Sequence, residues 1–193
     1  MSLQPKKRYT LDEYLALERS TREKHEYFRG EVFAMGGASE PHNLIVGNVL
    51  ASLHGKLRDK PCRVYLSDLR VKINPSGLYT YPDVVVVCGE PRFEVGDTLL
   101  NPTLLVEVLS ESSEAYDRGK KSEQYRTLPS LSDYLLITQD RALVEHYSRQ
   151  PGERWLLHAA NTLSDSVAIP SLGCELLLAE VYLNVSGLDS VGA

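Results

Sequence analysis

The chain has few cysteines, and the three that it has lie far apart. Cys62, Cys88 and Cys174 fit no zinc-binding spacing and no disulfide framework. Each lies in an apolar stretch, so we expect three small core side chains in a reducing compartment. This pattern argues against a disulfide-stabilised scaffold and against a zinc-binding module.

Long apolar runs and an excess of positive charge are missing as well. No segment approaches the roughly 20 apolar residues of a membrane span, and residues 1–7 lack the apolar core of a signal peptide. We therefore expect a cytoplasmic protein with no membrane partner. The formal net charge of −5 argues against a protein that coats nucleic acid, but it leaves room for an enzyme with a local basic cleft.

The common nucleophilic and phosphate-binding motifs are absent too. No Ser–His–Asp or Cys–His arrangement can be defended, and Gly36–Gly37 is too short for a phosphate-binding loop. The histidines are scattered without the spacing of metal ligands. Any catalytic site must therefore be built from other side chains.

The 193 residues, 42% of them hydrophobic and 24% charged, suit one well-buried domain. We place it at residues 9–185, followed by a flexible tail at 186–193. The order of apolar patterns predicts an α+β fold with a central mixed β-sheet flanked by helices. We expect helices at about 11–17, 41–57, 115–128 and 177–186, and strands around a turn at Gly30 and at 62–66, 69–73, 84–87, 104–109, 134–138, 143–147 and 155–158, with a turn at 74–77.

Two of these strands each carry a carboxylate among apolar neighbours. Asp83 precedes Val84–Val87, and Glu107 lies inside Leu104–Leu109. An ionised carboxylate is costly in such surroundings unless a positive charge pairs with it. A divalent cation shared by the two carboxylates would resolve their mutual repulsion. The pair therefore predicts a metal site with Asp83 and Glu107 as ligands.

These residues also match a known family. Pro82-Asp83, followed about two dozen residues later by Glu107, resembles the metal-dependent PD-(D/E)XK nuclease superfamily, and more closely its Uma-type restriction endonuclease branch. The supporting segments are 9–14 (YTLDEY), 25–31 (HEYFRGE), 41–43 (PHN), 116–121 (YDRGKK) and 128–136 (LPSLSDYLL). The resemblance covers roughly residues 9–185 and implies a restriction-endonuclease-like fold.

The chain departs from the superfamily motif at one position. The motif places a lysine two residues after the glutamate, where this chain has Leu109. The helix expected after Glu107 offers Lys120 and Lys121 instead. Asp117, Lys121 and Tyr125 are spaced by four and share one helical stripe, which favours Lys121. An ordinary surface ion pair between Asp117 and Lys121 is the competing interpretation.

The resemblance implies hydrolysis of phosphodiester bonds in DNA. Asp83 and Glu107 would hold Mg²⁺, or Mn²⁺, and Lys121 would stabilise negative charge at phosphorus. Glu26 would complete the catalytic set, although its charged neighbours are also typical of a solvated face. His42 could contact phosphate or orient a water molecule, but packing at a helix end explains it equally well, so we leave it out of the catalytic set.

A second class of function stays open at this point. The chain could be a catalytically inactive module that keeps the nuclease fold for nucleic-acid binding or assembly. The retained charges favour the enzyme, whereas the acidic composition and Leu109 favour the module. By analogy with enzymes that cut both strands of a duplex, we expect a homodimer.

Overall fold

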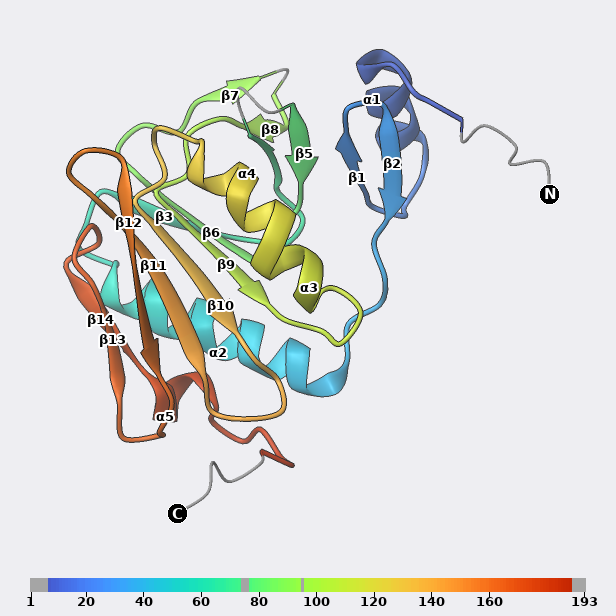
Figure 1. Ribbon diagram of the computed structural model, residues 1–193. Helices are drawn as coiled ribbons and strands as arrows, with labels where there is room; N and C mark the ends of the chain where they lie inside the picture. Colours follow the sequence, from blue (N-terminus) through green and yellow to red (C-terminus); the bar gives the residue numbers. More distant parts are fainter. Residues whose placement is uncertain (1–6, 74–76, 95, 189–193) are drawn as a thin grey trace.

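The computed structural model describes residues 7–73, 77–94 and 96–188. Within these ranges, two six-stranded sheets form, and one of them, the central sheet, contributes to the core on both of its faces (Figure 1). Its spatial order is β12 (Arg154–Ala160), β11 (Val144–Gln150), β10 (Asp133–Ile137), β9 (Leu104–Val108), β6 (Val84–Cys88) and β3 (Cys62–Leu66). Strands β9 and β10 run parallel and the other neighbours run antiparallel, so the predicted central mixed sheet is confirmed.

A second six-stranded sheet of the described chain carries the N-terminal hairpin. Its order is β2 (Glu31–Ala34), β1 (His25–Phe28), β5 (Leu78–Thr80), β4 (Arg70–Ile73), β8 (Thr98–Leu99) and β7 (Phe93–Glu94). The turn between β1 and β2 consists of Arg29 and Gly30, and both have positive φ, at 49° and 91°. A two-residue hairpin of type I′ requires this conformation, which glycine adopts at little cost.

Both faces of the central sheet are covered, as the uninterrupted apolar strands predicted. Val84 and Val86 pack with Leu104 against α2 (Glu40–Lys56) and α5 (Leu178–Val181). The opposite face, with Val85 and Leu105, packs against α4 (Ser122–Arg126) and against strands of the second sheet. Figure 1 shows α2 and α4 on opposite sides of β6, β9 and β10.

Helix boundaries follow local capping signals. The helix α1 (Leu11–Ser20) begins with the expected capping box, in which Thr10 and Glu13 bond reciprocally. The helix α2 begins after Ser39, whose hydroxyl accepts the His42 N–H, and has a proline in its first turn.

The helix expected at 115–128 is divided into three parts. They are α3 (Glu114–Tyr116), a π-helical turn η1 (Asp117–Lys121) and α4. Such π-turns insert a residue into a helix and are frequent at functional sites. A periodicity of 3.6 residues could not predict this interruption.

Several short strands escaped the sequence prediction. The loop between the two carboxylate strands contains β7 and β8, and the chain after β12 forms the hairpin of β13 (Ser166–Ile169) and β14 (Cys174–Leu177). Strands of two to four residues carry too few alternations to register as a pattern. Tertiary pairing, not local propensity, forms them.

The prediction of three unpaired cysteines was wrong for two of them. Cys62 and Cys88 face each other in the register of β3 and β6 and form a disulfide, with a Cα–Cα distance of 4.0 Å. Cys174 is free. The sequence argument failed because the bonded cysteines are 26 positions apart, and only strand pairing brings them together. The cysteines therefore no longer support a reducing compartment.

Parts of the sequence prediction fall outside the described residues. These are most of the N-terminal residues 1–7, most of the turn 74–77 and the end of the tail 186–193. Within the described part of that tail, Leu188 packs against the core beside Val185. Among the described residues, no helix has the length and apolar character needed to cross a bilayer.

Candidate active site

A lysine surrounded by carboxylates lies between the two sheets. The Nζ atom of Lys121 is 2.9 Å from Glu26 Oε1, 2.9 Å from Glu107 Oε1 and 3.4 Å from Asp117 Oδ1. All four residues are at least 93% buried, since their exposed fractions are 3–7%. We call these four residues the lysine–carboxylate cluster. It brings together three of the four catalytic residues predicted from the sequence.

The four members of the cluster come from three elements, because η1 supplies both Asp117 and Lys121. Glu107 is the fourth residue of β9, and Glu26 is the second residue of β1. Lys121 ends the π-turn η1, which presents its side chain to both strands. Lys120 is exposed to solvent. The structure therefore places Lys121, and not Lys120, beside the predicted carboxylates.

Two hydroxyl groups hold the carboxylates of the cluster in place. The Tyr125 hydroxyl donates to Glu107 Oε1 at 2.6 Å, and the Thr80 hydroxyl donates to Glu26 Oε1 at 2.5 Å. The two hydroxyl oxygens are themselves 3.2 Å apart. Tyr125 was visible in the sequence as part of the helical stripe. Thr80 was missed, although its position opposite Glu26 on β5 continues the register of the second sheet.

Asp83, the fourth predicted residue, lies beside the cluster. Val84 pairs with Val106, so extending this antiparallel register by one residue sets Asp83 opposite Glu107. Asp83 Oδ2 accepts the backbone N–H of Val108 at 2.7 Å. Asp83 and Glu107 therefore share the same end of the β6–β9 pair.

His42 also belongs to this region, although the sequence argument set it aside. Its Nε2 atom is 3.1 Å from Asp83 Oδ1, and α2 supplies it from its first turn. Burial opposes protonation of the ring, but the hydrogen bond and charge of Asp83 outweigh burial and raise the pKa of His42. The sequence signal was the position of His42 in the N-terminal turn of a helix.

Burial and charge shift the pKa values of the cluster in a consistent way. Burial raises the pKa of Glu107 well above its usual value, even though Lys121 lies beside it. Burial acts against the charge of Lys121, but Glu107 and the other carboxylates raise its pKa well above that of a free lysine. The ammonium therefore stays charged, and the surrounding carboxylates compete for too little positive charge.

The side chains around Lys121 include the donor type that a divalent cation prefers. Four buried acidic residues, Glu26, Asp83, Glu107 and Asp117, face two basic groups, Lys121 and His42. Carboxylate oxygens are the ligands that Mg²⁺ prefers. Across the described residues, however, no group of three or more His, Cys, Asp or Glu side chains is arranged to hold a metal ion. Lys121 occupies the space where the carboxylates converge.

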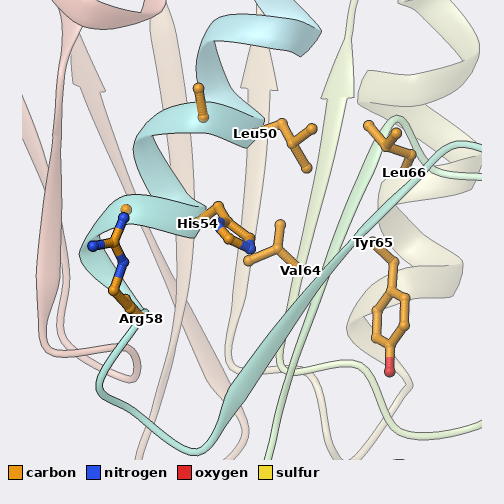
Figure 2. Close-up of a pocket in the computed structure, with 8 residues that line it drawn as sticks. Leu50, His54, Arg58, Val64, Tyr65 and Leu66 are labelled. Atoms are coloured by element: carbon orange, nitrogen blue, oxygen red, sulfur yellow. The ribbon is translucent and has the colours of Figure 1, made fainter.

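A different cavity lies away from these charges. It measures about 640 Å³ and lies between α2 and the edge strand β3 (Figure 2). It is lined by Leu50, Ala51, His54, Gly55, Arg58, Val64, Tyr65 and Leu66. This lining contains no carboxylate and none of the residues predicted for catalysis.

Comparisons with known proteins identify the family. The model of the Uma2 family, described as "Putative restriction endonuclease", matches residues 11–180. The uncharacterized protein sll1609 of Synechocystis is 39% identical over 150 residues, which cover 77% of this chain and 85% of that protein. The uncharacterized protein slr1290 of the same organism is 36% identical over 171 residues, which cover 89% and 90%. The chain belongs to the Uma2 family, as the sequence motifs predicted.

A solved structure supports the fold. The chain resembles the crystal structure of a putative nuclease belonging to DUF820 from Anabaena variabilis, with a TM-score of 0.71. The match covers 90% of this chain and 97% of that one at 19% identity. The restriction-endonuclease-like fold predicted from the sequence is confirmed.

Proposed function

We propose that this protein is a metal-dependent endonuclease that hydrolyses phosphodiester bonds in DNA. The family to which it belongs and the description of the Anabaena protein as a putative nuclease support the class of reaction. The observation that carries the proposal is the buried Lys121 held 2.9 Å from carboxylates of two separate strands. A charge cluster this costly to bury is typical of catalytic sites.

In this proposal Asp83 and Glu107 hold Mg²⁺ or Mn²⁺. A bound divalent cation lowers the pKa of a water molecule and polarises a phosphoryl oxygen. Glu107 can offer Oε2 to such an ion, because its contacts within the described chain use Oε1. His42 and the Val108 amide fix the orientation of Asp83.

Lys121 acts on the negative charge that develops at phosphorus. Glu26 and Asp117 hold its ammonium in place, so little reorganisation is needed when the phosphate approaches. Tyr125 and Thr80 in turn orient Glu107 and Glu26. The role of Glu26 is therefore to position Lys121 and to complete the carboxylate set.

The test is cleavage of supercoiled plasmid DNA by the purified protein. We expect nicking or cutting with Mg²⁺ or Mn²⁺ and none after chelation with EDTA. Glu107→Gln removes the charge with little change of shape and should reduce the rate by orders of magnitude. Glu90→Gln is the matched control, since the Glu90 side chain is 87% exposed. Activity that survives Glu107→Gln would overturn the proposed site.

The second candidate is an inactive nuclease fold that binds nucleic acid. The observation that favours it is that Lys121 already neutralises the carboxylates, with no three-ligand metal group among the described residues. Titration of the wild type with Mn²⁺ by calorimetry separates the two. Binding that Glu107→Gln abolishes supports the enzyme, whereas DNA binding without any metal uptake supports the inactive module.

We also propose that the chain works as a homodimer, because two sites are needed to cut both strands of a duplex at once. Light scattering on the protein as it elutes from a size-exclusion column should give a molar mass twice that of one chain, which is 21.6 kDa. A single-chain mass at all concentrations would contradict this assembly.

A further inference from the structure

The strand β2 exposes an aromatic ring next to the lysine–carboxylate cluster. Phe33 is 42% exposed and lies directly opposite Glu26 in the β1–β2 register. Residues directly opposite in an antiparallel pair point to the same face, with Cβ atoms about 5 Å apart. Glu26 points to Lys121 on that face. Phe33 therefore lies on the face of the sheet that carries Glu26, one strand further out than Glu26.

A small cavity runs along the outer edge of the same strand. It measures about 220 Å³ and is lined by Lys7, Tyr9, Glu31, Val32 and Phe33. Cavities for whole drug-sized ligands measure roughly 300–1,000 Å³, so this one suits a single flat group. Two aromatic side chains and one cation line it, with the Lys7 ammonium 4.3 Å from the centre of the Tyr9 ring.

The hairpin tip concentrates positive charge in a protein of net charge −5. Lys7, Arg8 and Arg29 are exposed there, and none of them forms an ion pair with another described residue. Glu31 is the one acidic member of the cavity lining. Glu13 lies close enough to Lys7 to feel its charge, so three cations face two carboxylates. This leaves a local positive excess that is complementary to phosphate.

The surface formed by Lys7, Tyr9 and the β1–β2 hairpin, which we call the platform, is held in shape before any ligand binds. The Tyr9 amide donates to the Gly30 carbonyl at 2.9 Å, and the Tyr27 hydroxyl donates to the Tyr9 carbonyl at 3.3 Å. The two-residue turn fixes Arg29 and Gly30. A preorganised surface loses less conformational entropy on binding than a mobile loop.

We propose that this edge of β2 binds an unpaired segment of the DNA substrate next to the cleavage site. A base stacks on Phe33 or enters the cavity beside Tyr9, and the flanking phosphates contact Lys7, Arg8 and Arg29. Bases inside a duplex already stack on each other, so an exposed ring selects bases that have left the stack. The inference rests on the proposed function for its substrate, and it adds a preference for unpaired DNA.

The experiment measures binding of a fluorescein-labelled thymidine oligonucleotide by anisotropy, in EDTA so that no cleavage occurs. A labelled hairpin duplex is the comparison. We expect the wild type to bind the single strand more tightly. Phe33→Ala should weaken that binding roughly 5- to 100-fold, the range for loss of one stacked base. Phe93→Ala is the matched control, because Phe93 is 40% exposed on β7 at the opposite edge of the same sheet.

The salt dependence tests the cations separately. Arg29→Gln should reduce the slope of log affinity against log salt by about 0.7, the value for one phosphate contact on a single strand. Phe33→Ala should leave the slope unchanged, and so should Arg58→Gln, an exposed control in the cavity of Figure 2. Thermal melting should show all four variants folded, since every substituted side chain is exposed.

Equal binding of single strand and duplex, with no effect of Phe33→Ala, would overturn the inference. That result is distinct from failure of the proposed function. If the wild type cleaves plasmid DNA and Glu107→Gln does not, the catalytic site stands while the edge of β2 has no role. If no DNA is cleaved but Phe33→Ala still weakens single-strand binding, the binding site at the edge of β2 stands and the proposed catalytic function fails.

Discussion

At the scale of single residues, the balance of buried charge dominates this protein. Lys121 is the cation that Glu26, Glu107 and Asp117 share, and each of these groups would be costly to leave unpaired. The raised pKa of Glu107, which burial causes, shows that one lysine does not fully compensate its surroundings. The same imbalance would favour uptake of a further cation.

The first prediction concerns Lys121→Met. Removing one partner of a buried ion pair typically costs about 3–5 kcal/mol, so the free energy of unfolding in urea should fall by that amount. Lys120→Met is the control and should change it by less than about 0.5 kcal/mol, because Lys120 is exposed. Mn²⁺ should raise the melting temperature of Lys121→Met more than that of the wild type, since it replaces the missing charge. Equal stability of the two variants would contradict the ion-pair geometry.

The second prediction follows from the pKa of His42. Burial opposes its protonation, but Asp83 raises the pKa above the unfolded value of about 6.5. The charged pair therefore contributes its full stability below about pH 6.5, and this contribution is lost as the pH rises through the folded pKa. His42→Gln keeps a donor but cannot gain a proton. The difference in unfolding free energy between wild type and His42→Gln should shrink toward alkaline pH, and a constant difference would refute this account.

At the scale of elements, a helix cap and a π-turn position the side chains of the site. Ser39 caps α2 by accepting the His42 N–H at 3.2 Å, and its hydroxyl lies 2.5 Å from Gln139 Oε1. The π-turn η1 positions Lys121 at the other side of the sheet. Both are local irregularities that a regular helical pattern hides.

The third prediction is that Ser39→Ala lowers the free energy of unfolding by about 1 kcal/mol, through loss of the cap. Plasmid cleavage should slow as well, because the first turn of α2 carries His42 to Asp83. Ser39→Asp preserves the capping oxygen and should restore stability. Chemical denaturation and a cleavage assay measure the two effects, and a stable but inactive Ser39→Asp would show that the hydroxyl has a further role.

At the scale of the whole molecule, the central sheet joins two layers that meet at the site. The edge strand β3 is fixed to β6 by the Cys62–Cys88 disulfide, which joins the terminal residue pair of their register. The N-terminal hairpin joins the second sheet by pairing β1 with β5, and its Glu26 contacts Lys121 directly. The substrate platform proposed on β2 therefore belongs to a different sheet from Glu107.

The fourth prediction is that reduction of this disulfide destabilises the protein. A cross-link between residues separated by 26 positions contributes about 3–4 kcal/mol in the chain-entropy model. Dithiothreitol should lower the urea midpoint of the wild type and leave that of the Cys62→Ala, Cys88→Ala double variant unchanged. Titration of three free thiols in the unreduced, unfolded protein would contradict the disulfide.

The sequence alone determined the family, the helices with clear caps, and the strands around Asp83 and Glu107. These features depend on local signals: capping boxes, apolar runs and short motifs that survive without tertiary information. The choice of Lys121 over Lys120 was also predictable, because Tyr125 and Asp117 mark the stripe. The metal site that Asp83 and Glu107 would form together stays a prediction.

Only the tertiary structure decided which distant residues meet. The pairing of β1 with β5 places Thr80 beside Glu26, and the pairing of β3 with β6 joins Cys62 to Cys88. The approach of α2 to the end of β6 brings His42 to Asp83. Such contacts depend on strand register and on the order of strands in each sheet. No local propensity encodes these, because they are selected by burial of the whole core at once.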